Sequence, residues 1–342
     1  IFEAAFQVEK YFIRADIIEK NGNTINLIEV KSKSFSGNTS RDLLGKRGKL
    51  TKEWKKYLYV VAFQKHVITR AKPNWQVNAF LMLANTNAKA TVDGLNQKFR
   101  LKDRGNGKTT VEMTGGISPA DLGDEILIRD NVDDICQMIY EGTDTNLQPA
   151  RAYRTQVNYL ARHYWRDKKI KVPIHKDCQG CEFQATPEEE KLGKLSGFKE
   201  CWKEQAKFRD EDFEKPSVLD IWNFGGKQKL INAGIYHIDE VKPENIGKEA
   251  EINKRKLDNK SRQWLQVQRT AGKDPEPYLD IQGIKEEMDK WVYHLHMIDF
   301  ETSTVAVPFY RGRRPYEQTA FQFSHHQIKE DGSIEHKGQY LN

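Results

Sequence analysis

The stretch YFIRADIIEKNGNTINLIEVKS, residues 11–32, decides the fold that we predict for this chain. Tyr11–Ile18 and Ile25–Val30 are short runs rich in β-branched and other apolar residues, which is typical of buried strands. Asn21-Gly22 lies between them and is a strong signal for a tight hairpin turn, because glycine tolerates a positive φ. We therefore expect two neighbouring antiparallel strands joined by a short turn.

Further elements of regular structure are predicted on both sides of this hairpin. Apolar residues at helical spacing favour a helix after it, and Lys72-Pro73 ends that helix. The order of strand, hairpin, helix and strand is typical of an α/β, restriction-endonuclease-like core. The predicted strands are Ile1–Val8, Gln76–Ala84, Tyr293–Phe300 and Thr319–His325, and the predicted helices are Thr51–Ala71 and Val132–Tyr140.

Three charged side chains of the hairpin form the first candidate site. Glu29 and Lys31 are two residues apart, so they project from one face of a strand, and Asp16 approaches Glu29 across the hairpin. Neighbouring carboxylates repel each other unless a cation lies between them. Mg²⁺ or Mn²⁺ accepts such oxygen ligands, with the Val30 carbonyl as a further one. The pattern suits metal-dependent phosphodiester hydrolysis, in which Lys31 positions the attacking water or stabilises charge. By itself the spacing is a weak signal, because ordinary charges on a solvent-facing strand match it too.

The cysteines form the second candidate site. Cys178 and Cys181 are spaced as CxxC, and Cys201 follows after a longer gap. Thiolates at this spacing can reach one metal ion or cluster. Four cysteines in a chain of this size do not suggest a disulfide scaffold, so we expect metal or cluster ligation in a reducing cytoplasm.

The basic residues are concentrated in two segments. Lys and Arg number 55 against 49 Asp and Glu, a net charge of +6. Residues 151–176 contain eight Lys/Arg and one acid, Asp167, with aromatic residues interleaved; residues 41–72 are similarly basic. Such segments can contact phosphates and stack on bases, although a solvated helix face gives the same pattern. We expect nucleic acid, with DNA favoured, to contact Arg151, Arg154, Arg162, Arg166, Lys168 and Lys169.

Composition excludes a membrane-spanning helix. Mean hydropathy is −0.76, and no run of 18 apolar residues occurs. Neither an initiator methionine nor a secretory leader is visible, and the chain begins inside a predicted strand. We expect a cytoplasmic protein without a membrane partner, whose natural N-terminus extends further.

A third pair of acids, Asp299 and Glu301, ends the apolar run YHLHMIDFETS, residues 293–303. They face one side of a strand and are oriented to hold a metal ion. Acids at exposed strand ends are also common without any such role. This pair is a candidate metal site on the spacing alone.

The phrases IRADIIEK and INLIEVKS resemble the signature of PD-(D/E)xK nucleases of the RecB-like family, including CRISPR-associated exonucleases that carry an iron–sulfur cluster. The resemblance implies a metal-dependent deoxyribonuclease, an exonuclease, and assigns Gln64 of YVVAFQKHVI to its site. Such relatives hold the cluster with one Cys before the core and three after it. A 4Fe–4S cluster on Cys178, Cys181 and Cys201 is thus implied, with its fourth Cys upstream of this chain. Zinc with His175 or Cys136 as fourth ligand, or an empty site, are the alternatives.

The C-terminal phrases DFETS and PYEQTAFQFSHH resemble the opening of a DnaQ-like 3′–5′ exonuclease domain, which has an RNase H-like fold. Nearly the whole chain is similar to a bacterial family of uncharacterised proteins that joins a RecB-like core to such a domain. The expected segments are a nuclease core over 1–142, a cysteine subdomain over 143–215, a helical spacer over 216–290, and an incomplete exonuclease domain over 291–342. Within the spacer, residues 229–246 read as helix, glycine-containing turn and helix, which is either a helix-hairpin-helix or a packed helical spacer. DnaQ-like catalysis needs further residues from later segments, so this last part is not expected to cut alone.

A non-catalytic alternative fits the same residues. The chain would then bind nucleic acid or a protein partner through a cysteine metal site, and the nuclease core would be degenerate.

Overall fold

The computed structural model describes residues 1–342 except 38–42, 46, 106–108, 116, 145–152 and 253–256. The fold is mixed α/β and divides into two compact units. The first unit comprises Ile1–Lys169 together with Trp291–Asn342, and the second comprises Ile170–Lys290. This division is coarser than the four expected segments, because Cys178, Cys181 and Cys201 share one unit with the expected spacer, and residues 291–342 share the other with the expected core.

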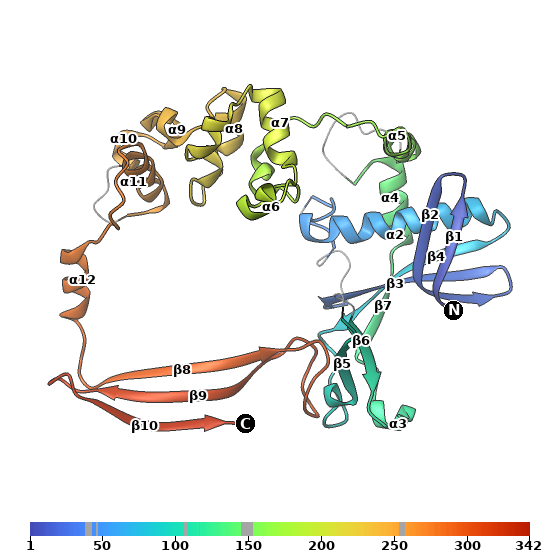
Figure 1. Ribbon diagram of the computed structural model, residues 1–342. Coiled ribbons are helices and arrows are strands. Elements are labelled where there is room, and N and C mark those ends of the chain that lie inside the picture. The colour runs from blue at the N-terminus through green and yellow to red at the C-terminus, as the bar shows by residue number, and fades with distance from the viewer. Residues whose placement is uncertain (38–42, 46, 106–108, 116, 145–152, 253–256) are drawn as a thin grey trace. The chain divides into compact units, whose positions relative to one another are not determined.

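A five-stranded sheet organises the first unit (Figure 1). Its strand order is β1-β2-β3-β4-β7, and every neighbouring pair is antiparallel except β3 and β4, which are parallel. The parallel pair is connected through helix α2. The strands are β1 (Phe2–Val8), β2 (Tyr11–Asn21), β3 (Thr24–Phe35), β4 (Gln76–Asn85) and β7 (Leu127–Asn131).

The predicted hairpin is present between β2 and β3. Asn21 pairs with Thr24, so the turn consists of Gly22 and Asn23. Gly22 has a φ of +58°, a value that glycine adopts without steric cost. The register continues to the pair Ile17 and Ile28 and stops there.

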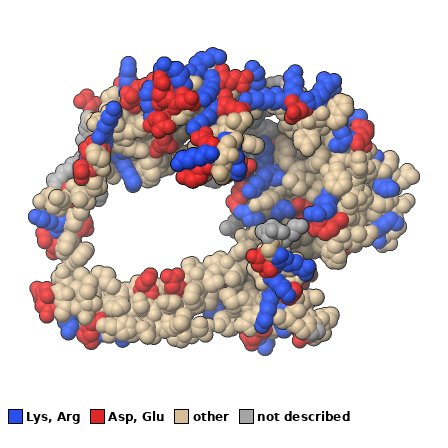
Figure 2. All heavy atoms as spheres, viewed as in Figure 1, with Lys and Arg blue, Asp and Glu red and all other residues tan. Residues whose placement is uncertain are grey.

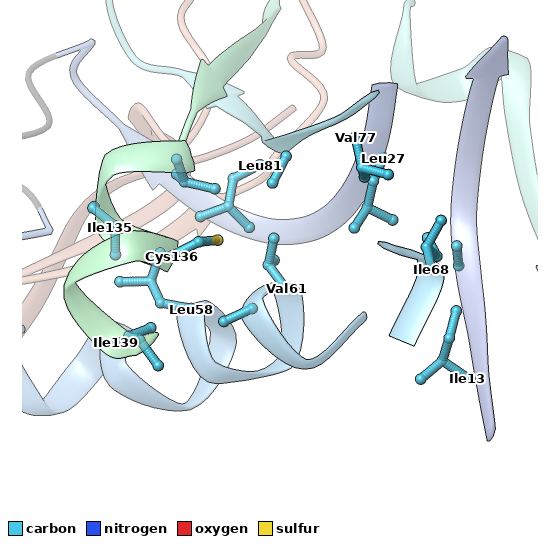
Figure 3. Close-up of a cluster of buried hydrophobic side chains, with 14 of the residues drawn as sticks. Ile13, Leu27, Leu58, Val61, Ile68, Val77, Leu81, Ile135, Cys136 and Ile139 are labelled. Atoms are coloured by element: carbon cyan, nitrogen blue, oxygen red, sulfur yellow. The ribbon is translucent and has the colours of Figure 1, made fainter. Parts of the chain in front are cut away.

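Helix α2 (Lys52–Ala71) packs against this sheet and against α4 (Asp133–Glu141). Its apolar residues recur every three or four positions, so they form one buried stripe, and the helix stops before Pro73, which disfavours helical backbone in the preceding residue. Figure 3 shows Leu58, Val61 and Ile68 of α2 among side chains from the strands and from α4. The predicted helix over 51–71 is confirmed to within one residue.

The C-terminal strands form a separate three-stranded sheet in order β10-β9-β8. Backbone hydrogen bonds attach its β8–β9 connection to the loop after β4: Ala90 N–H donates to Arg313 O at 2.9 Å, and Gly94 N–H to Phe309 O at 2.7 Å. Val307 also packs against the small apolar cluster of Ala90, Leu95 and Ile126. The strands are β8 (Leu295–Thr304), β9 (Gln318–Ile328) and β10 (Ile334–Leu341), and the two predicted strands fall within β8 and β9 apart from the first residues of the former.

Smaller elements complete the first unit. A hairpin of β5 (Phe99–Asp103) and β6 (Thr109–Met113) extends between β4 and β7 in sequence. Helix α5 (Tyr153–Trp165) follows α4 and buries Tyr153 and Val157. The remaining elements are the 3₁₀ turn η1 (Asn96–Lys98) and α3 (Pro119–Leu122).

The second unit is built from short helices around one apolar core. Trp202, Val218, Ile221 and Leu230 are fully or nearly buried at its centre. The expected helix–turn–helix over 229–246 is present only in part, because a 3₁₀ turn and a four-residue helix replace the second helix. The elements are η2 (Lys176–Gly180), α6 (Pro187–Lys191), α7 (Gly197–Ala206), η3 (Asp210–Glu214), η4 (Val218–Asp220), α8 (Lys227–Asn232), η5 (Ile238–Glu240), α9 (Pro243–Ile246), α10 (Glu249–Ile252), α11 (Asn259–Ala271) and α12 (Ile281–Met288).

Candidate active site

The first candidate site lies where β2 and β3 separate. Backbone pairing of these strands ends at Ile17 and Ile28, one position before Asp16 and Glu29. There the Asp16 side chain replaces the backbone partner, because its Oδ2 accepts a hydrogen bond of 2.8 Å from the Val30 N–H. The carboxylate of Asp16 is therefore held beside the Glu29–Lys31 segment.

The Lys31 ammonium group brings three oxygen atoms together. It donates to Glu29 Oε1 and, over 3.1 Å, to the Val30 carbonyl oxygen. It also lies 4.0 Å from Asp16 Oδ2. Oxygens of two carboxylates and one carbonyl thus surround a single positive charge, which is the donor set expected from the sequence.

Gln64 reaches this group from helix α2. Glu29 is only 4% exposed and Gln64 only 6% exposed. The Gln64 Nε2 donates to Glu29 Oε2 over 2.8 Å, so both oxygens of the buried carboxylate are hydrogen-bonded. A buried carboxylate requires such partners, because desolvation without them is costly. The buried Oε1 of Gln64 has no hydrogen-bond partner within the described part of the chain.

An irregularity of β3 follows the site. Pairing of β3 with β4 is regular through Val30 and Met82 and resumes at Ser34 and Ala84, with a shift of register between them. Such bulges bend a strand and redirect its side chains. Lys31 lies within this irregular segment, and the next lysine, Lys33, pairs instead with Glu53 of α2.

Cys136 is a core residue of the first unit. It is 1% exposed and projects from α4 into the apolar core that this helix shares with α2 (Figure 3). Burial raises the pKa of its thiol to about 12. A thiol held neutral in an apolar core is a small hydrophobic side chain, as its place in an apolar helix indicated.

The other three cysteines lie in the second unit and are partly exposed. Cys178 Sγ accepts a hydrogen bond of 3.5 Å from the His175 N–H. Burial, and then the neighbouring thiols of Cys181 and Cys201, raise the pKa of Cys178. Cys178 and Cys201 pack against the same apolar core, but among the described residues no three His, Cys, Asp or Glu side chains are close enough to hold one metal ion.

Asp299 and Glu301 lie on β8 of the C-terminal sheet. Asp299 is opposite Ser324 and Glu301 is opposite Gln322, so both acids share one face, and both are exposed. The strand is irregular directly after Glu301. The pair is arranged as predicted, and no third acid joins it in the residues that the structure describes.

The predicted nucleic-acid contacts lie at and after helix α5. Arg154, Arg162, Arg166, Lys168 and Lys169 are exposed, whereas Arg151 lies outside the described residues. Lys and Arg, blue in Figure 2, are frequent on the part of the surface that contains α5. The expected basic surface is therefore present, and its binding of nucleic acid stays a prediction.

An aromatic groove beside α5 was not predicted. Its residues come from three segments that are far apart in the sequence: the start of β2, the middle of α2, and α5. Each segment reads as an ordinary apolar pattern by itself. The local signals that pointed to it were the aromatic residues four apart on α2, Tyr59 and Phe63, and the aromatic residues interleaved along 151–176, of which Tyr153 and Tyr164 line the groove.

Comparison with known proteins identifies only the C-terminal part of the chain. A family model described as Domain of unknown function (DUF2779) matches residues 296–342, which include β9, β10 and nearly all of β8. Neither the curated proteins nor the solved structures contain a match to this chain. Over the described residues, no helix is both long enough and apolar enough to cross a membrane.

Proposed function

We propose that this chain is a metal-dependent nuclease of the PD-(D/E)xK type that hydrolyses the phosphodiester bonds of DNA, acting as an exonuclease. One observation carries the proposal: the Lys31 ammonium lies among oxygens of Glu29, Val30 and Asp16. These are hard oxygen donors, which Mg²⁺ and Mn²⁺ prefer. An arrangement that already concentrates three of them around one cationic group suits a divalent ion.

Each residue has a distinct part in the proposed reaction. Asp16, Glu29 and the Val30 carbonyl would hold Mg²⁺ or Mn²⁺, which polarises a phosphodiester and lowers the pKa of water. Lys31 provides a positive charge beside both carboxylates, where negative charge develops on the phosphate. Gln64 is a positioning residue, because its hydrogen bond fixes the orientation of Glu29.

The proposal is tested with purified protein and end-labelled DNA. Wild-type protein should shorten the DNA with Mg²⁺ or Mn²⁺ and not with a chelator. Lys31→Ala should reduce cutting by about a hundredfold or more. Lys33→Ala is the matched control, since Lys33 lies on the same strand and pairs with Glu53 instead. If Lys31→Ala cuts as fast as Lys33→Ala, the assignment of Lys31 to the active site is wrong. If the wild-type protein binds DNA without cutting it, the chain is a non-catalytic binding module instead.

The cysteines support a second, structural proposal. We propose that Cys178, Cys181 and Cys201 hold a 4Fe–4S cluster, with Zn²⁺ as the alternative, in a reducing cytoplasm. The free thiols lie in one unit, and Cys178 and Cys201 pack against its core, which supports the proposal; a complete set of ligands does not form among the described residues. Anaerobic purification, an absorption spectrum and metal analysis decide between cluster, zinc and an empty site. Asp299 and Glu301 remain a proposed DnaQ-like metal pair.

A further inference from the structure

The aromatic groove of the first unit, which we call the stacking groove, is a second feature of functional interest. It encloses about 550 Å³ and is lined mostly by aromatic and aliphatic side chains. Its principal lining residues are Tyr11 and Phe12 of β2, Tyr59 and Phe63 of α2, and Leu160 and Tyr164 of α5.

The floor of the stacking groove is fixed, whereas its edges are open. Tyr11 is buried, its ring meets Phe63 edge-on at 6.0 Å, and its hydroxyl donates to Asn158 Oδ1. Phe12 and Tyr164 are by contrast 62% and 91% exposed. Large aromatic side chains exposed together along a groove indicate a binding surface, because leaving them in water is unfavourable.

The charge around the stacking groove identifies the kind of partner. Lys10 lines it, and Lys55 and Arg70 lie over the rings of two of its residues, Tyr59 and Tyr11, at 5.2 and 5.6 Å from the ring centroids. On α5, Arg154 is exposed beside the face that lines the groove. Cationic edges complement a phosphodiester backbone, and an aromatic floor complements bases that are free to stack. An unpaired nucleic-acid strand offers both features, whereas a duplex keeps its bases inside.

The stacking groove and the candidate active site share two elements. Phe63 of the groove directly precedes Gln64 of the site on α2. On β2, Phe12 precedes Asp16 by four residues, which is about 13 Å along a strand. That distance corresponds to about four stacked nucleotides at ~3.4 Å each. A strand of that length is what would join the groove to the Asp16 carboxylate.

We infer that the stacking groove binds the bases of a single-stranded nucleic acid and guides that strand toward Asp16 and Glu29. The inference rests on the proposed nuclease function for its direction, but the binding itself is independent of catalysis. DNA and RNA strands share the chemistry that the groove recognises.

The test measures binding in the absence of hydrolysis. Fluorescence anisotropy with chelator present follows a short single-stranded DNA, the same sequence as RNA, and its DNA duplex. Phe12→Ala and Tyr164→Ala remove exposed rings, so the fold is retained, and each should weaken the Kd for the single strand by about tenfold. Trp165→Ala is the matched control, because Trp165 is 76% exposed on the same helix and does not line the groove. Stacking should also quench 2-aminopurine placed in the strand, and Tyr164→Ala should restore its fluorescence.

Two outcomes would overturn the inference. One is an unchanged Kd in both groove variants; the other is a DNA duplex that binds the protein more tightly than the single strand does. Failure of the proposed function is a different result: the wild-type protein then binds the strand through the groove and does not cut it when Mn²⁺ is added. If the protein cuts DNA while the groove variants bind normally, only the inference fails.

Discussion

The backbone amide of Val30 donates a 2.8 Å hydrogen bond to the Asp16 carboxylate at the position where β2 and β3 cease to pair. The side chain thus satisfies a backbone donor that the separating strand no longer satisfies. The same contact holds Asp16 beside Glu29 and Lys31. Asp16 therefore has a structural role as well as its proposed chemical one, and substitutions must separate the two.

Asp16→Asn should separate the structural role of Asp16 from its proposed role in catalysis. Its amide oxygen can still accept from Val30, so the free energy of unfolding should change by less than about 1 kcal/mol, whereas Asp16→Ala, which removes this exposed hydrogen bond, should lose about 0.5–1.5 kcal/mol more. Both variants should lose metal-dependent cutting, because a negative ligand is absent. Urea unfolding and DNA cleavage measure the two effects. Glu19→Gln removes another carboxylate of β2, and strong loss of cutting in that variant would argue against a specific role for Asp16.

Gln64→Met should destabilise the protein by about 1–3 kcal/mol, because it leaves a buried oxygen of Glu29 without its donor at nearly constant side-chain volume. Cutting should fall as well. The comparison is Gln137→Met, which removes an exposed 2.7 Å hydrogen bond to Glu141 on α4 and should have little effect on stability. If both substitutions lower the free energy of unfolding in urea by the same amount, the buried Gln64–Glu29 hydrogen bond contributes no more than an exposed one.

His66 should make the stability depend on pH. Its ring lies among Tyr11, Tyr140 and Tyr153, and burial, with Arg70 and Arg154, lowers its pKa below the ordinary 6.5. The unfolded chain takes up a proton as pH falls through about 6.5, whereas the folded protein does not. The free energy of unfolding should therefore decrease below that pH. His66→Phe should reduce this dependence, and His163→Phe should not; identical pH profiles would refute the prediction.

Cys136 and Cys181 should respond differently to substitution. Cys136→Ser introduces a hydroxyl into an apolar core and should cost about 1–3 kcal/mol without changing iron or zinc content. Cys181→Ser should lower the metal content of protein purified anaerobically. Loss of metal from Cys136→Ser, with the fold intact by circular dichroism, would instead make Cys136 a ligand.

The sequence predicted the local parts of this fold well. The apolar runs around Gly22 and the stripe of α2 are signals within single segments, so β2, β3 and α2 were located correctly. The two-residue spacing of Glu29 and Lys31 also predicted that their side chains project from the same face of β3. The stacking groove depends on three distant segments, and the short turns of the second unit have no periodicity long enough to detect. The presence of Gln64 in the site was expected only through a family resemblance, and its hydrogen bond to Glu29 was not predicted, because no local pattern links residues so far apart.

The most direct test of the account is a crystal of the protein soaked in Mn²⁺, with the anomalous signal of the metal recorded. We predict a peak at about 2.0–2.2 Å from oxygens of Asp16, Glu29 and the Val30 carbonyl, lost in crystals of Asp16→Asn. A fully soaked crystal with no peak at this position, or with Lys31 still bonded to Glu29 and the metal bound only elsewhere, would contradict the account.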